Sequence, residues 1–421
     1  MPVINPRLFL RSLFEAAVTA ADPLTGIKAH LPAKPKGQTI VVGAGKGAAH
    51  MARTLESVWD GQLTGTVVTR FGYGCHVKNI DILEASHPVP DAAGMDAAKR
   101  LFEQVGGLGP DDLVIALICG GGSALLPSPP SGLTLEDEIT LNEALLASGA
   151  PISAMNVVRK HLSTIKGGRL AAATKARVVS LIVSDIPGDN PAHVASGPTV
   201  PDGSTRHDAL ELVEQYKLSL PPRMLEHLAS SAADAPRPDD PQFANNSHHI
   251  IASAGVSLEA AAEIARRQGV MPVILSDSVE GESRDVALVH AAIAREVLAK
   301  DRPFTKPVVI LSGGETTVTL KNKDGRGGRN AEFALAMGLA INGHDIHVLA
   351  ADTDGIDGSE NNAGAFADGE TVRRLRDVGL DARKLLDGND SYSGFTAIGD
   401  LFETGPTGTN INDLRAILIQ S

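Results

Sequence analysis

Runs of consecutive apolar residues, each ending in glycine or small polar residues and followed by a helical pattern, recur along this sequence. Uninterrupted apolar runs, unlike alternating ones, indicate strands that are covered on both faces. Such strands form parallel sheets whose neighbours are joined by crossover helices. The sequence therefore predicts an α/β fold built on parallel sheets. The runs are TIVVGAGKG (39–47), DLVIALICGGGS (112–123), VVSLIVSDIPGD (178–189), HHIIASAG (248–255), MPVILSD (271–277), PVVILSGGE (307–315) and DIHVLAADTDG (345–355).

The chain has 421 residues, more than one hydrophobic core usually organises, so two domains are expected. Residues 230–246 interrupt the pattern with prolines and aspartates, which indicates an interdomain linker or a long surface excursion. We expect residues 1–240 to form a Rossmann-like domain, a parallel sheet with helices on both faces. Residues 241–421 should form a smaller α/β domain, with a cleft between the two.

Charge and hydrophobicity exclude several classes of function. The formal net charge of −12 would repel a polyanion, so nucleic acid is not expected as a partner. The longest apolar run, Leu113–Cys119, is far shorter than the roughly 20 residues that cross a bilayer. Residues 1–20 lack the features of an export signal, and two cysteines suit a reducing compartment. We therefore expect a cytoplasmic protein without membrane insertion, and the sequence leaves open whether it forms a homo-oligomer.

The loop VVGAGKGAAHMA is the first candidate binding site. Gly43, Gly45 and Ala48 satisfy the permissive dinucleotide fingerprint, which is a weak signal by itself. An NAD site also expects an acidic residue at the end of the next strand, but that strand ends at Arg70, which leaves only NADP open. Lys46 is more informative, because an ammonium in a glycine turn can meet a transferring phosphoryl group or a substrate carboxylate. An exposed loop lysine without a role is the competing interpretation.

The loop CGGGSALL is the second candidate. Gly120, Gly121, Gly122 and Ser123 precede a helical segment, an arrangement suited to cradling phosphates through backbone N–H groups. The chain contains no GxxxxGK[ST] loop, and Leu125 stands where a GxSxG nucleophile elbow needs its last glycine. A serine hydrolase therefore loses its main support. Glycines that only permit tight turns remain an equal explanation for any single loop.

Basic residues gather in NVVRKHLSTIKGGRLA, where Arg159, Lys160, Lys166 and Arg169 flank two glycines. In a chain of negative net charge, this concentration of cations suggests an anion site, although a solvated basic helix end is the plainer interpretation.

Asp185 and Asp189 follow the strand VVSLIVSD, where hard oxygen ligands can hold the Mg²⁺ of a bound nucleotide. Aspartates in such turns are also ordinary Asx caps. The following HVASGPT adds Ser196 as a candidate loop ligand. Histidines such as His87 show no metal-ligand spacing and are interpreted as structural.

In the second half, DGRGGRNAEFALA places Arg329 in a glycine loop ahead of a helix. A guanidinium there can bind a carboxylate bidentately or neutralise a transferred phosphoryl group. The aspartates of ADTDGIDG look superficially like calcium ligands, but the spacing fails as an EF-hand loop. We interpret them as a polar turn that lines the cleft.

Taken in order, these motifs resemble the glycerate 2-kinase family, whose C-terminal portion is known as the MOFRL domain. The resemblance covers nearly the whole chain, and it implies two α/β domains around a deep cleft. It further implies ATP with a divalent cation, Mg²⁺, and phosphoryl transfer to the 2-hydroxyl of D-glycerate. The motifs are VVGAGK, SHPVPD, CGGGSALL, KHLSTIKGGRLA, SDIPGD, ASGPT, SGGETTV, GGRNAEFAL, ADTDGIDG and GDLFETGPTGTNINDL.

By this resemblance the family's catalytic lysine corresponds to Lys46 and its arginine to Arg329. We expect Arg329 to hold the glycerate carboxylate or phosphoryl oxygens, and Lys46 to stabilise charge at the reacting centre. The expected nucleotide-binding residues are Gly43, Gly45, Gly120, Gly121, Gly122, Ser123, Lys166 and Ser196, and the expected metal ligands are Asp185 and Asp189.

Two other functions stay open at this point. The chain is also similar to proteins of tartrate degradation that have carried the name hydroxypyruvate reductase, so an NAD(P)H-dependent reductase is the main alternative. A non-catalytic binding protein for small acids is the second. Against the reductase stand Lys46 inside the loop and the additional phosphate-like loops, which hydride transfer does not need.

Overall fold

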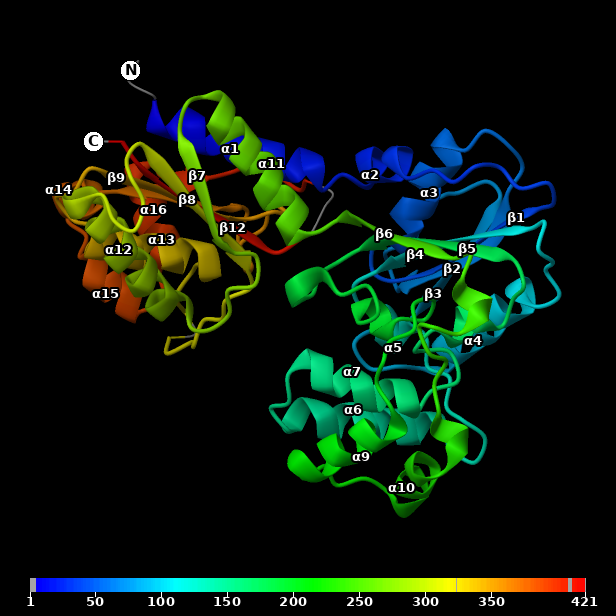
Figure 1. Cartoon of the computed structure of the whole chain (residues 1–421). Coiled ribbons are helices and arrows are strands. Elements are labelled where there is room, and N and C mark those ends of the chain that lie inside the picture. The colour runs from blue at the N-terminus through cyan, green and yellow to red at the C-terminus, as the bar shows by residue number, and fades with distance from the viewer. Residues whose placement is uncertain (1–4, 323, 408–410, 421) are drawn as a thin grey trace. The chain divides into compact units, whose positions relative to one another are not determined.

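The computed structural model describes residues 5–322, 324–407 and 411–420 (Figure 1). By residue contacts the chain divides into two compact units. The first, here called the N-terminal unit, is Pro23–Ile251; the second, the C-terminal unit, joins Met1–Asp22 to Ala252–Ser421. These bounds differ from the continuous stretches 1–240 and 241–421 expected from the sequence, because the first helix packs in the C-terminal unit and a strand beyond residue 240 pairs in the N-terminal sheet.

The N-terminal unit is built on a six-stranded sheet of order β3-β2-β1-β4-β5-β6, and the register joins β1 to β5 as parallel strands. This is the strand order of a Rossmann fold. The predicted parallel sheet is therefore confirmed for this unit. Its strands are β1 (Thr39–Ala44), β2 (Thr64–Arg70), β3 (Ile80–Ala85), β4 (Leu113–Cys119), β5 (Arg177–Val183) and β6 (Ser247–Ala252).

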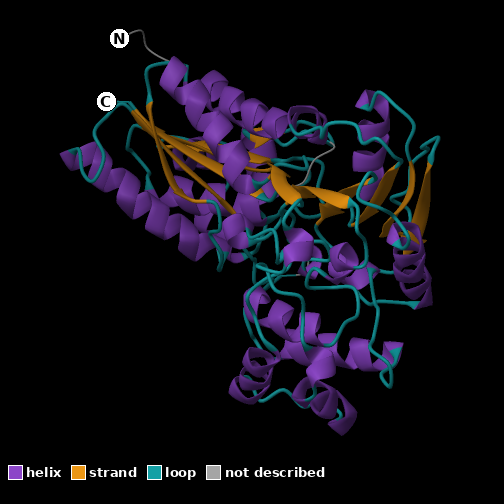
Figure 2. Cartoon of the chain, turned by 45° about the vertical axis from the view of Figure 1, so that its right-hand side comes forward, coloured by secondary structure: helices purple, strands orange, loops and turns teal. Residues whose placement is uncertain are grey.

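Helices cover both faces of this sheet, as Figure 2 shows. Alternate residues of one strand enter different cores: Val42 packs with the helix α4 (Ala92–Val105), whereas Val41 packs with α2 (Pro23–Ala29) and α3 (Ala48–Val58). Since both faces are buried, the central strands β1, β4 and β5 are apolar at most positions, which explains the uninterrupted runs in the sequence.

A small helical layer is inserted between β4 and β6, and it has a core of its own. Two of its helices begin with a capping box, Thr134 with Asp137 and Thr205 with Asp208. The local sequence therefore determines where these two helices begin. The four long helices are α6 (Leu135–Ala147), α7 (Ile152–His161), α9 (Arg206–Gln215) and α10 (Pro222–Ala229), and the short ones are α5 (Gly122–Leu125) and α8 (Arg169–Ala172).

The C-terminal unit has a mixed sheet of order β11-β10-β9-β12-β8-β7. Only β7 and β8 pair in parallel, and the expectation of a parallel sheet is wrong here because the last strand, β12, lies antiparallel between β8 and β9. This central strand is buried along its whole length. The strands are β7 (Met271–Ser276), β8 (Val308–Gly314), β9 (Ile346–Asp352), β10 (Gly364–Asp368), β11 (Leu401–Phe402) and β12 (Asp413–Ile419).

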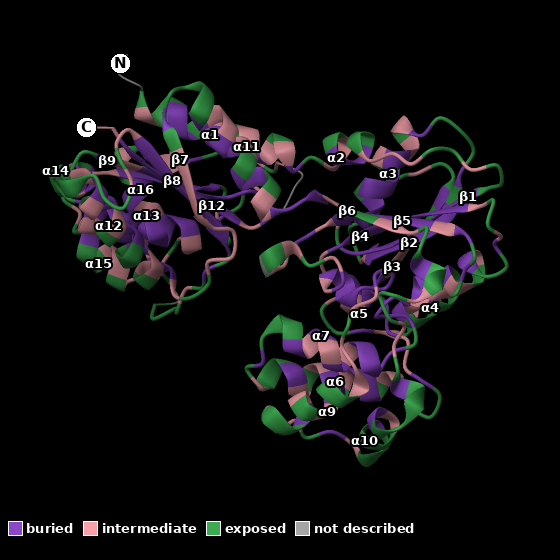
Figure 3. Ribbon diagram, viewed as in Figure 1, coloured by how far each residue is buried: buried purple, intermediate pink, exposed green. Residues whose placement is uncertain are grey.

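Helices also cover both faces of the second sheet, and Figure 3 shows their buried sides turned towards the strands. One face carries the N-terminal helix α1 (Pro6–Ala20) and α11 (Ala254–Arg267). The other carries α12 (Ser283–Lys300), α13 (Arg329–Ala340), α14 (Thr371–Asp377), α15 (Ala382–Asp387) and α16 (Ser391–Ile398). Within the residues that the structure describes, no helix combines the length and apolar character needed to cross a membrane.

The α1 contact yields a stability prediction. Phe14 is 1% exposed, and its ring packs edge-on against Phe402 at 4.9 Å between centroids. Phe14→Ala should lower the free energy of unfolding by about 3–5 kcal/mol, because the lost ring leaves a cavity. Differential scanning calorimetry measures this as a lower Tm for the transition of the C-terminal unit. Leu8→Ala is the matched control, since Leu8 lies on the same helix and is 65% exposed; equal losses in the two variants would contradict the packing of α1.

Candidate active site

Two glycine loops of the N-terminal unit meet where the strand order reverses, between β1 and β4. In open α/β sheets this point, beyond the carboxyl ends of the strands, is where ligands bind. The backbone N–H of Lys46 donates to the carbonyl oxygen of Gly120 at 2.8 Å, which ties the loop after β1 to the loop after β4. The structure thus brings together two of the sites predicted separately from the sequence.

The loop that carries Lys46 is held from several sides. The Thr69 hydroxyl donates to the Lys46 carbonyl oxygen at 3.0 Å, and the N–H of Gly47 donates to Cys119 Sγ at 3.1 Å. Burial raises the pKa of the Cys119 thiol to about 12, so this sulfur stays protonated and serves as packing. Gly45 has a φ of 139°, and a Cβ there would lie 2.3 Å from Cys119 Sγ. Only glycine fits this turn.

Other glycines of these loops have packing reasons of their own. A Cβ on Gly43 would lie 2.5 Å from the carbonyl oxygen of Leu117, and one on Gly122 would lie 2.7 Å from Cβ of Ala195. A Cβ on Gly120 would lie 1.9 Å from a carboxylate oxygen of Asp185. The close approach of strands and loops therefore accounts for these glycines, and their predicted contact with a nucleotide stays a prediction.

Ser123 and Ser196 are joined by a hydrogen bond of 2.9 Å between their hydroxyls. Ser196 is 1% exposed, and its hydroxyl also donates to the side-chain oxygen of Asn156 at 2.9 Å. Ala195 and Ser196 both have left-handed backbone conformations, with φ of 52° and 60°. Such strain persists only where the surroundings impose it. Asn156, which the sequence did not single out, provides part of that constraint.

Two of the four basic residues expected around α7 are neutralised within the fold, whereas Arg159 and Arg169 donate to amide or carbonyl oxygens. Lys166 is 2% exposed and forms an ion pair with Glu138, and the buried Lys160 forms one with Asp202. A buried ammonium that is already paired offers little attraction to an incoming phosphate. The role of Lys166 in nucleotide binding stays a prediction, although its present partner is a carboxylate of the protein.

The candidate metal ligands are placed differently from each other. The Asp185 carboxylate lies against Gly120 at the carboxyl edge, whereas Asp189 sits in the short turn Pro187–Asp189 with a φ of 49°. Across residues 5–322, 324–407 and 411–420, no three His, Cys, Asp or Glu side chains gather as a metal site would require. A nucleotide-bound Mg²⁺ needs only one or two protein carboxylates. The assignment of Asp185 and Asp189 as metal ligands therefore stays a prediction.

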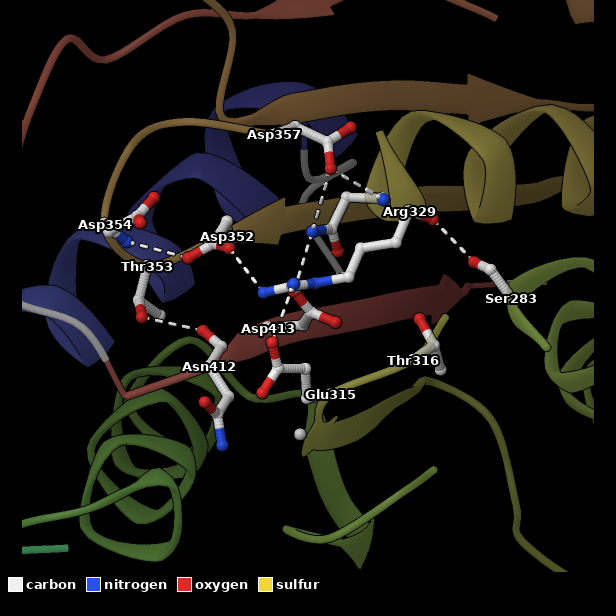
Figure 4. A network of polar contacts seen from close by, with 12 residues as sticks. Ser283, Glu315, Thr316, Arg329, Asp352, Thr353, Asp354, Asp357, Asn412 and Asp413 are labelled. Atoms are coloured by element: carbon white, nitrogen blue, oxygen red, sulfur yellow. Dashed lines mark hydrogen bonds and ion pairs between the residues drawn. The ribbon is translucent and has the colours of Figure 1, made fainter. Parts of the chain in front are cut away.

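In the C-terminal unit, Arg329 is the centre of a network of carboxylates, shown in Figure 4. Its Nε donates to Asp413 at 2.8 Å, one terminal nitrogen donates to Glu315 at 2.9 Å, and the other donates to Asp352 at 2.6 Å. Glu315 follows β8, Asp352 ends β9 and Asp413 begins β12. Because β12 runs antiparallel, its first residue pairs with the last residues of both neighbours, Gly314 and Asp352.

Asp413 is a second centre of this network and was not predicted as a site residue. It is buried, and besides Arg329 it accepts hydrogen bonds from Asn330 at 2.7 Å and from Arg415 at 2.6 Å. Arg415 also donates to the Gly313 carbonyl and the Thr316 hydroxyl. An aspartate and an arginine two residues apart in an otherwise apolar strand lie on the same face. This pattern in the sequence could have indicated Asp413 as a site residue.

Burial and mutual repulsion shift the titration of these carboxylates. Burial, reinforced by the charge of Asp413, raises the pKa of Asp352 to about 8. Burial also raises the pKa of Asp357 to about 6, although this carboxylate accepts the backbone N–H groups of Asn330 and Ala331 at the start of α13. Burial alone would lower the pKa of Arg329, but Asp413 and Asp352 raise it, so its guanidinium is permanently charged.

Comparison with known proteins agrees with this geometry. Residues 9–229 match a family described as a domain of unknown function, DUF4147, and residues 308–413 match the MOFRL family. A protein named glycerate 2-kinase from Pyrococcus horikoshii is 40% identical, covering 92% of this chain and 88% of its own. A protein from Agrobacterium vitis that carries the name hydroxypyruvate reductase is 49% identical, covering 99% of this chain and 95% of its own.

A solved structure with the same fold supports the assignment. The crystal structure of glycerate kinase from Thermotoga maritima superimposes with a TM-score of 0.87 at 36% sequence identity. The match covers 98% of this chain and 99% of that one, so both units are included. With two matching domain models and relatives of this similarity along nearly its full length, the chain belongs to the glycerate 2-kinase family.

Proposed function

We propose that this protein transfers the γ-phosphoryl group of ATP to the 2-hydroxyl of D-glycerate and forms 2-phospho-D-glycerate. The observation that carries the proposal is the position of Lys46, in a constrained glycine turn where the strand order of the N-terminal sheet reverses. Its ammonium forms no ion pair with the residues that the structure describes, unlike the buried Lys160 and Lys166. A positive charge carried by this constrained loop suits a reaction that moves a charged phosphoryl group.

The chemistry of phosphoryl transfer requires mainly positioning and charge neutralisation. Lys46 would stabilise the charge that develops on the oxygens of the transferred group. Asp185, one loop away, would hold a Mg²⁺ ion, which when bound supplies further positive charge to the nucleotide phosphates. The hydrogen bonds that Thr69 and Cys119 form with the loop hold the backbone from which the Lys46 side chain extends.

Arg329 is proposed to hold the glycerate carboxylate or the phosphoryl oxygens. A guanidinium has five N–H donors, and the carboxylates of Asp413, Glu315 and Asp352 accept one bond each. The remaining donors, with a side chain that is 24% exposed, are available to a ligand. That Lys46 and Arg329 act together in an interdomain cleft stays a prediction.

A coupled assay with product identification tests the proposal. Purified protein with ATP, Mg²⁺ and D-glycerate should form 2-phosphoglycerate, which enolase converts to phosphoenolpyruvate. Formation of 3-phosphoglycerate alone would keep the kinase class and reject the 2-position. Absence of any phosphorylated product would reject the proposal.

A hydroxypyruvate reductase is the second candidate, because relatives about as long as this chain carry that name. The strand order of the N-terminal sheet is compatible with dinucleotide binding, but β2 ends in Arg70 instead of the acidic residue that binds a ribose. Loss of nicotinamide absorbance with hydroxypyruvate and NADPH would establish this activity. Loss with NADH alone would show that Arg70 does not select the cofactor.

Replacing Lys46 tests its proposed role. Lys46→Met keeps the length of the side chain and removes its charge, so kcat should fall by about 100-fold or more while the Tm stays unchanged. Lys99→Met is the matched control, because Lys99 is 77% exposed on α4, where it pairs with the surface carboxylate of Glu103. Steady-state kinetics and thermal unfolding check both variants. A kcat within twofold of the wild type in Lys46→Met would remove this residue from the mechanism.

The raised pKa of Asp352 predicts a pH dependence of substrate binding. Below pH 8 this carboxyl is protonated and neutral, and above pH 8 it ionises and competes with the substrate for Arg329. The KM of the reactant that Arg329 holds should therefore rise by about tenfold between pH 7 and pH 9. In Asp352→Asn the carboxylate cannot form, so this KM should stay flat over the same range. An identical rise in the variant would show that another group titrates.

A further inference from the structure

Three basic residues stand at the carboxyl edge of the N-terminal sheet. Lys46 follows β1, Arg70 ends β2, and His87 follows β3. These strands are neighbours in the order β3-β2-β1, and all of them run in the same direction. The three side chains therefore come from adjacent strand ends, although the sequence separates Lys46 from His87 by about 40 residues.

Lys46 and His87 meet over the glycine of the next loop. If Gly121 carried a Cβ, that atom would lie 3.0 Å from Nε2 of His87 and 3.1 Å from Cγ of Lys46. The φ of 80° at Gly121 also disfavours any side chain at this position. The loop after β4 thus leaves room for the His87 imidazole and the aliphatic stem of Lys46.

Arg70 completes the cluster. Its guanidinium stacks on the Tyr73 ring at 4.3 Å from the centroid. Burial lowers the pKa of His87, and the charges of Lys46 and Arg70 lower it further. Both cations therefore act electrostatically on the imidazole and favour its neutral form.

The side chains of this cluster lie outside the ion pairs of the described residues. Among the residues that the structure describes, neither Lys46 nor Arg70 forms an ion pair, and His87 forms none either. The nearby Glu84 accepts hydrogen bonds from the backbone N–H groups of Gly72 and Gly74. The other groups that face this edge are the protonated thiol of Cys119 and the carboxylate of Asp185 against Gly120.

We infer that Lys46, Arg70 and His87 form one anion subsite, which takes an oxyanion of a reactant: a nucleotide phosphate or the carboxylate of the hydroxy acid. The inference rests on the proposed function and deepens it, because it assigns Arg70 and His87 to the binding of a reactant. In a chain with a net charge of −12, converging cations without protein counterions are matched by a ligand anion. The stacking of Arg70 on Tyr73 restricts the motion of the guanidinium.

The subsite predicts proton uptake by His87 when an oxyanion binds. A bound anion favours the imidazolium, so the pKa of His87 should rise upon binding. NMR titration of the His87 ring, assigned by the resonance missing from His87→Asn, measures this shift without any turnover. Inorganic phosphate and D-glycerate are the separate probes, and the one that raises the pKa identifies the oxyanion. No shift with either probe at saturating concentration would overturn the inference.

Kinetics of Arg70→Gln give a second test. Loss of a charged hydrogen bond should raise the KM of one reactant by about tenfold or more and leave the other KM within twofold. A rise for ATP assigns the subsite to the phosphates, and a rise for D-glycerate assigns it to the carboxylate. Lys99→Gln removes the same charge from an exposed position of the same unit and should change neither KM. Unchanged KM values in both Arg70→Gln and His87→Asn would overturn the subsite.

The two tests separate this inference from the proposed function. If the wild type forms no phosphoglycerate while phosphate raises the pKa of His87, the kinase proposal fails and the anion subsite stands. If the wild type is an active kinase while the His87 titration and the Arg70→Gln kinetics are unaffected, the subsite fails and the kinase stands.

Discussion

The burial of both faces of both sheets is the constraint on which the rest of the structure depends. When helices cover a sheet on both sides, its interior positions must be apolar, and polar chemistry is confined to the strand ends and the loops beyond them. The N-terminal unit follows this rule closely. Lys46, Gly120 and Asp185 each lie just beyond the carboxyl end of a buried strand, and the hydrogen bond from Lys46 to Gly120 links two of these loops.

In the C-terminal unit the polar residues also lie at the strand ends, but the sheet is mixed instead of parallel. Its antiparallel central strand begins where its neighbours end, so Asp413 stands beside Asp352 and close to Glu315 without any long loop. Charged residues at that edge require mutual compensation, because they are largely withdrawn from water. Arg329 and Arg415 supply it, and Asp413 accepts from both. The helix α13 is fixed to the same edge, since Asp357 accepts the first backbone N–H groups of that helix.

Local sequence patterns predicted much of the first unit and less of the second. The strand runs around Lys46, Ser123 and Asp185 are signals within a few residues, and the parallel order follows from general rules for crossover connections. The antiparallel placement of β12 depends on pairing with strands about 70 and 105 residues earlier in the chain, which no local pattern encodes. The ion pair of Lys166 with Glu138, 28 residues apart, could not be predicted for the same reason. The sequence therefore suggested that the Lys166 ammonium is available to a ligand anion, whereas a protein carboxylate already binds it.

The electrostatic contrast between the two units follows from these pairings. The carboxyl edge of the N-terminal sheet keeps cations without protein counterions, whereas Arg329 is surrounded by more negative charge than it can neutralise alone. An unpaired ammonium attracts anions strongly but orients them weakly, because it is a point charge on a flexible stem. A guanidinium held by three carboxylates attracts them less, but its planar donors are fixed in direction. The first arrangement is suited to attracting an anion and stabilising its charge, and the second to orienting a ligand by its geometry.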